Sequence, residues 1–102
     1  MKFEIDHETV LASVNEALEL YDRFGTNIEQ HLSMMRKAED EESAVCIAKS
    51  ISYNRRMMAV YLERAAAVLE LIGVFHSETD CIDYETIREK AEEIKKTAKA
   101  NE

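Results

Sequence analysis

The stretch AVCIAKSISYNRRMMAVYLERAAAVLELIGVF, residues 44–75, decides the fold of this chain. Its seam positions are Ala44, Ile47, Ile51, Asn54, Met58, Tyr61, Ala65, Val68, Ile72 and Phe75. Their spacing alternates between three and four residues, which is the repeat of helices that pack side by side. Asn54 is the polar member of this seam. The pattern predicts one long helix over about 43–75.

The second half of this stretch, residues 60–75, is apolar on nearly every face of the predicted helix. A helix that is apolar all round has to be covered on several sides. Small residues suited to close approach by neighbouring helices lie here, namely Ala65, Ala66, Ala67 and Gly73. We therefore expect the core of the protein around residues 60–75.

A second seam precedes the central stretch and predicts a helix over about 7–38 with Asp6 as its N-cap. The seam residues are Leu11, Val14, Leu18, Tyr21, Gly25, Ile28, Leu32 and Met35. Gly25 leaves two interpretations open. The segment Thr26–Glu29 has the T-x-x-E spacing of a capping box, which would start a new helix. The repeat nevertheless passes through Gly25 without a slip, which favours one continuous or kinked helix.

An acidic turn at residues 39–43, with Asp40 as a second cap, forces the two helices into an antiparallel hairpin. This register places Tyr21 near Tyr61 and sets Gly25 opposite Met57 and Met58.

A third helix is predicted over about 83–99, capped by Asp80 or Asp83. Its seam residues are Tyr84, Ile87, Ala91, Ile94 and Ala98. Because it is about half as long as the hairpin, it can cover only residues 60–75 of the central helix. We expect an all-α single domain, 1–102, with a frayed polar tail at 95–102.

Composition limits the functional classes that fit this chain. Its 102 residues carry a net charge of −8, with no proline and two glycines. The charge is net −7 over residues 1–43, +2 over 44–76 and −3 over 77–102. An acidic total argues against direct nucleic-acid binding, which needs clustered lysine and arginine. The two cysteines, Cys46 and Cys81, have neither zinc-site nor disulfide-framework spacing. We expect a soluble cytoplasmic protein without membrane spans.

No spacing in the sequence predicts a metal, a cofactor or a catalytic centre. Glu16 and Glu19 have the E-x-x-E spacing that small helical pyrophosphatases of the MazG type use to hold magnesium. The second such pair here, Glu39 and Glu42, falls in the turn rather than on a facing helix, so the comparison fails. We expect a protein without enzymatic activity.

The middle of the central helix carries the main basic cluster in an acidic chain, and its candidate site residues are Lys49, Tyr53, Asn54, Arg55 and Arg56. One hypothesis is structural: the arginines form ion pairs with the first helix near Asp22 and Glu29, and Asn54 fixes the register. The other hypothesis is a site for an anion, a nucleotide-like ligand or an acidic partner, with planar arginine donors.

The hairpin also carries more apolar surface near its turn than two helices can bury between them. The predicted self-association face comprises Ile28, Leu32, Met34, Met35, Val45 and Ile51. A second copy would supply the missing layer, so we expect a homo-oligomer, with a dimer favoured, completed into a larger bundle.

These features favour a small acidic interaction or regulatory protein with an unidentified protein partner. The alternative is an acidic inhibitor that blocks the basic nucleic-acid groove of a host enzyme, as small viral anti-defence proteins do. A second alternative is an anion or nucleotide-like ligand binder that uses Tyr53, Arg55 and Arg56.

Overall fold

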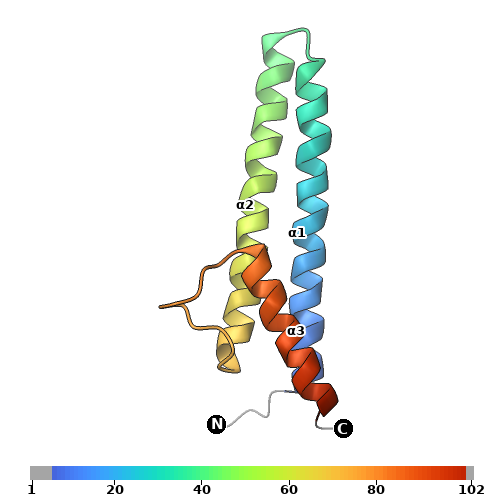
Figure 1. Cartoon of the computed structure of the whole chain (residues 1–102). Helices are drawn as coiled ribbons and strands as arrows, with labels where there is room; N and C mark the ends of the chain where they lie inside the picture. Colours follow the sequence, from blue (N-terminus) through green and yellow to red (C-terminus); the bar gives the residue numbers. More distant parts are fainter. Residues whose placement is uncertain (1–5, 101–102) are drawn as a thin grey trace.

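The computed structural model describes residues 6–100, with side chains through residue 97, and shows an all-α chain. Helices α1 (His7–Arg36) and α2 (Glu41–Leu71) form a long antiparallel hairpin, and the shorter α3 (Tyr84–Ala100) crosses its lower half (Figure 1). The molecule measures 58 × 25 × 24 Å. The predicted hairpin with a shorter third helix is confirmed. Residues 95–100, expected in a frayed tail, belong to α3, and residues 101–102 lie outside the described part.

Aspartates cap the starts of all three helices. The backbone N–H groups of Glu8, Ser43 and Thr86 donate to Asp6, Asp40 and Asp83 at 3.2, 2.6 and 2.8 Å, respectively. Each carboxylate satisfies an N–H group that has no partner inside its helix. Of the two caps considered for α3, Asp83 is therefore the one used. Asp80 instead accepts from the N–H of His76 at 2.8 Å and orders the preceding loop.

Helix α1 runs through Gly25 without a break, so the interpretation with two helices is excluded. A Cβ atom built at Gly25 would meet Met58 Cε at 3.5 Å, an ordinary van der Waals distance. The expected pairing of Gly25 with Met58 is therefore confirmed.

Helix α2 ends at Leu71, four residues before the predicted end at Phe75. Gly73 has a φ of +76°, which is the left-handed conformation that glycine adopts without strain. The N–H of Val74 donates to Leu69 O at 3.1 Å and that of Gly73 to Glu70 O at 3.0 Å, which is a Schellman C-cap. The prediction that Gly73 permits close helix approach is wrong, because no atom lies within 4 Å of its Cβ position.

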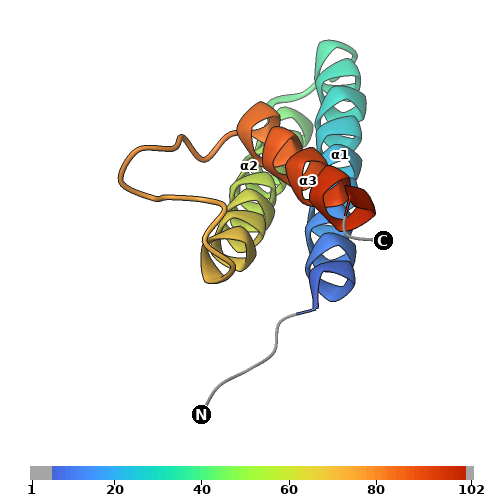
Figure 2. The same cartoon turned by 60° about the horizontal axis from the view of Figure 1, so that its bottom comes forward.

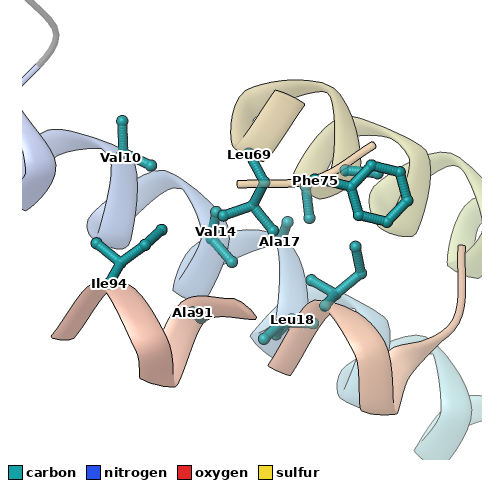
Figure 3. Close-up of a cluster of buried hydrophobic side chains, with 11 residues drawn as sticks. Val10, Val14, Ala17, Leu18, Leu69, Phe75, Ala91 and Ile94 are labelled. Carbon is teal, nitrogen blue, oxygen red and sulfur yellow. The ribbon is translucent and has the colours of Figure 1, made fainter. Parts of the chain in front are cut away.

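The core lies where α3 crosses the hairpin, as predicted (Figure 2). Its buried side chains come from all three helices and from the loop between α2 and α3: Val10, Val14, Ala17, Leu18, Ala65, Ala66, Leu69, Phe75, Ile87, Ala91 and Ile94. Figure 3 shows Leu69 beside Val14 and Ala17 of α1, with the Phe75 ring in the same cluster. Phe75 is fully buried although it lies outside any helix, so it fastens the loop to the core.

Aromatic contacts set the register of the helices, and they differ from the predicted pairs. Tyr61 stacks on Phe24, with ring centroids 5.8 Å apart, rather than on Tyr21. Tyr21 instead stacks on Tyr84 of α3 at 5.0 Å. α1 is thus rotated so that Phe24 faces α2 and Tyr21 faces α3. The periodicity identified both residues as inward-facing but could not assign each to a neighbour.

Candidate functional site

The upper half of the hairpin, residues 23–36 of α1 and 41–58 of α2, extends beyond the reach of α3 (Figure 1). It contains every residue of the predicted ligand site and of the predicted self-association face. In the structure these residues fall into three groups. One is a hydrogen-bonded polar pair between the helices, one is a row of exposed side chains on the outer face of α2, and one is a set of exposed apolar side chains flanked by charged residues.

Asn54 is 6% exposed and forms the polar pair with Asn27, which is half-buried. Its Oδ1 accepts from Asn27 Nδ2 at 3.3 Å, and its own Nδ2 donates to Ser50 O at 2.6 Å. One turn further along α1, His31 Nδ1 lies 2.6 Å from Asn27 O. The amide of Asn54 is therefore engaged in holding α1 against α2, as the structural hypothesis predicted, and is not open to a ligand.

Lys49, Tyr53 and Arg56 form an outer stripe on α2, because spacings of four and three residues place side chains on one helix face. All three are exposed, and Tyr53 is 52% exposed. The edge of the stripe touches α1, where Tyr53 packs edge-on against Phe24 with ring centroids 6.4 Å apart.

Arg55 does not belong to the outer stripe. It is exposed, and consecutive residues of a helix point about 100° apart, so Arg55 and Arg56 face different directions. The two arginines thus do not converge on one anion, which is what a shared binding pocket would require.

The predicted ion pairs between these arginines and α1 are absent. Among the residues that the structure describes, the one ion pair is Lys90 Nζ to Asp80 Oδ2 at 3.8 Å, near α3. The prediction that Arg55 and Arg56 pair with Asp22 or Glu29 of the same chain is wrong. Hydrogen bonding and the packing of apolar and aromatic side chains, rather than charge pairing, hold the middle of the hairpin.

The predicted self-association face is only partly accessible. Val45 is 46% exposed, Met34 53% and Leu32 36%, whereas Ile28 and Met35 are half-buried. Ile51 is 6% exposed and packs inside the hairpin, so it lies outside any accessible surface.

Glu16 and Glu19 line different grooves, which separates the two carboxylates that the E-x-x-E spacing suggested as a pair. Glu16 borders a shallow groove of about 140 Å³ between α1 and α2, where the Arg64 guanidinium lies 5.2 Å from the Tyr61 ring centroid. Glu19 borders another groove beside Tyr84 of α3. Within residues 6–100 no three His, Cys, Asp or Glu side chains gather as a metal site, and both cysteines are free and exposed.

The junction of α1 with α3 is a polar contact that sequence reasoning missed. The hydroxyl of Tyr84 donates to Asp22 Oδ2 at 3.4 Å. Partial burial, together with the Asp22 charge, raises the pKa of Tyr84. This contact marks how far up the hairpin α3 reaches, since Tyr84 is its first residue. Tyr21 and Tyr84 were identified as seam residues of their helices, but nothing in the sequence indicated that Asp22 would accept a hydrogen bond from Tyr84.

No helix of the described chain is long and apolar enough to cross a bilayer. Comparisons with protein families, with curated proteins and with solved structures give no match, so the fold and its surfaces carry the functional argument.

Proposed function

We propose that this chain is a protein–protein interaction protein without catalytic activity, acting as a small cytoplasmic regulator or adaptor. One observation carries the proposal: α3 covers one side of the hairpin over its lower half only. The same side continues uncovered over the upper half, where Leu32 and Val45 remain 36% and 46% exposed. An apolar helix face is ordinarily buried against another element, and exposed apolar patches rimmed by polar residues mark interaction sites.

The shape of this side supports a helical partner. α3 already lies on the lower half, packing Ile87, Ala91 and Ile94 against the hairpin. A partner helix on the upper half would meet the same kind of surface, an apolar strip between charged residues. Recognition of this kind uses apolar anchors at helical spacing.

The acidic-inhibitor hypothesis draws less support from the arrangement of charge. It needs carboxylates gathered on one exposed face. The acidic side chains are instead spread over the molecule, along α1 at Glu16, Glu19, Asp22 and Glu29, in the turn at residues 39–42, and on α3. On α3, Arg88 and Lys96 lie among the four glutamates Glu85, Glu89, Glu92 and Glu93 and offset part of their negative charge.

Site-specific photo-crosslinking tests the proposal. A photoreactive amino acid at Val45 should capture a partner protein in cells that make this chain, and one at Lys49, on the outer stripe, is the matched control. We expect capture from position 45 that disappears when Leu32→Glu is added. Equal capture from both positions, or capture unaffected by Leu32→Glu, would contradict the proposal. Circular dichroism of each variant verifies that the helices remain formed.

A further inference from the structure

We propose that the partner on the upper half is a second copy of this chain, packed antiparallel so that the two turns point in opposite directions. This inference rests on the proposed function, because it assigns an occupant to the same interaction surface. It follows from three features: which residues lie on the uncovered side, how their charges are spaced, and where α3 stops.

The residues on the uncovered side can be identified by stepping along α1 and α2, at the helical repeat, from the residues that α3 covers in the lower half. Asp22 of α1 contacts Tyr84 of α3, and one and two heptads further along α1 are Glu29 and Arg36. A heptad step returns to nearly the same side of a helix. Leu18 is a core residue that lines the groove beside Tyr84 and Ala91. Two heptads beyond it on α1 is Leu32.

On α2 the covered residues are Ala66 and Leu69, which belong to the core. Steps of three and four residues back along α2 pass through Leu62, Ala59, Arg55, Ser52, Ala48, Val45 and Glu41. We define the open face as Glu29, Leu32 and Arg36 of α1 together with Glu41, Val45, Ala48, Ser52 and Arg55 of α2. Every one of these side chains is exposed.

The charges on the open face are spaced to complement a second copy. Consider a two-fold axis that lies between the two open faces, runs perpendicular to the helices and passes beside Leu32 and Ala48. Each α1 then lies antiparallel to the α1 of the other copy. Glu29 then lies opposite Arg36 of the other copy, and Glu41 lies opposite Arg55. Each pair occurs twice by symmetry. These four charged groups form no ion pair among the described residues of a single chain.

The charge pairs on α1 and those on α2 are both consistent with this one axis. The Asn27–Asn54 hydrogen bond shows which levels of α1 and α2 lie side by side. Leu32 is five residues beyond Asn27, and Ala48 is six residues before Asn54, so the two lie at the same level to within about 1.5 Å. Charge spacing on α1 and charge spacing on α2 therefore give one common register.

The position of α3 is compatible with this register. Its first residue, Tyr84, contacts α1 at Tyr21 and Asp22, so the uncovered length begins at about residue 23. In the proposed overlap, Gly25 lies opposite Asp40 of the other copy, and the turn of that copy ends just short of α3. If both turns pointed the same way, the two α3 helices would compete for the space between the hairpins.

The overlap spans about 20 Å along two helices, roughly 400 Å² in projection for each copy. This is about half of the roughly 800 Å² per partner that a stable interface ordinarily buries, so we expect a weak dimer whose population depends on protein concentration. Ala48, with its small side chain at the axis, allows the two α2 helices to approach closely.

Crosslinking tests the position of the axis. In a Cys46→Ser, Cys81→Ser background, Ala48→Cys places one thiol beside its symmetry mate, and a short bis-maleimide should link two copies. Lys49→Cys, one residue further along and on the outer stripe, is the matched control and should give less than a tenth of that product. Equal linking of both variants, or of neither, would overturn the proposed arrangement.

Charge reversal tests the register. Sedimentation equilibrium of Arg55→Glu should show at least a tenfold weaker dimer at low salt, and Glu41→Arg in the same chain should restore it by exchanging the signs of the pair. A wild-type chain that is monomeric across the accessible concentration range overturns this inference. The proposed function fails separately, if photo-crosslinking from Val45 captures neither a second copy nor any other protein in a Leu32-dependent manner.

Discussion

Asn27 Nδ2 donates to Asn54 Oδ1 at 3.3 Å, which joins α1 to α2 about one helical turn inside the uncovered half of the hairpin. Ser50 O accepts the other amide hydrogen bond of Asn54. A buried amide is costly when a partner is missing, and a polar residue at a seam position fixes the register of packed helices. The pair therefore opposes slippage of the two helices, which have similar apolar seams along their length.

The first prediction concerns this pair. Asn54→Ala should lower the free energy of unfolding by about 1–3 kcal/mol, because it removes two hydrogen bonds from a buried position. Changing both residues, Asn27→Leu with Asn54→Leu, should cost much less, since no amide is then left without its partner. Urea unfolding of Asn27→Leu, Asn54→Leu and the double leucine variant measures the coupling between the two residues, and additive effects would show that the hydrogen bond contributes nothing.

The two glycines should respond to alanine in opposite directions. Gly25→Ala should raise the free energy of unfolding by about 0.5–1 kcal/mol, because Gly25 is inside a helix and its Cβ would meet Met58 Cε at an ordinary distance. Gly73→Ala should lower it by about 1–2 kcal/mol, because residue 73 has a φ of +76°. Thermal unfolding of both variants provides the comparison, and effects of the same sign would contradict the structure.

Two leucines at the end of α2 test where the core lies. Leu69→Ala should cost about 2–5 kcal/mol, since Leu69 is fully buried beneath α1 and α3. Leu71→Ala, two residues along the same helix, should change stability by about 0.5 kcal/mol at most, because Leu71 is 73% exposed. Similar losses in both variants would place α3 elsewhere.

The helix caps predict how the protein responds to acid. The hydrogen bonds from Ser43 lower the pKa of Asp40, and those from Thr86 lower the pKa of Asp83. A carboxylate whose folded pKa lies below its unfolded value, about 3.9, adds stability that is present above that value. This stability is lost as the pH falls through the folded pKa.

The double variant Asp40→Asn, Asp83→Asn should therefore lose less stability than the wild type between about pH 5 and pH 3. Asparagine keeps an acceptor for the N-terminal N–H groups and does not titrate in this range. Melting temperatures measured across this range test the prediction. Glu63→Gln, which alters an exposed carboxylate in the middle of α2, is the control. If both variants follow the wild-type curve, the caps do not carry the acid dependence.

Much of the fold could be predicted from particular residues of the sequence. The seam spacing around Ile51 and Ala65 required a long helix, and the acidic turn after Arg36 required an antiparallel partner. Asp6 and Asp40 marked helix starts because a short acceptor at the end of a helix binds free N–H groups. The short third seam, from Tyr84 to Ile94, could cover only the all-apolar half of α2.

The sequence by itself thus determined the order and antiparallel pairing of the helices, because these depend on periodicity and on local hydrogen bonding, whereas the structure decided that α1 continues through Gly25. Only the tertiary structure decided which side chains meet. One residue along a helix turns a side chain by about 100°, so small differences in helix rotation send Tyr21 to Tyr84 instead of Tyr61. The packing of α1 on α2 likewise buries Ile51, which the sequence had placed on an accessible face.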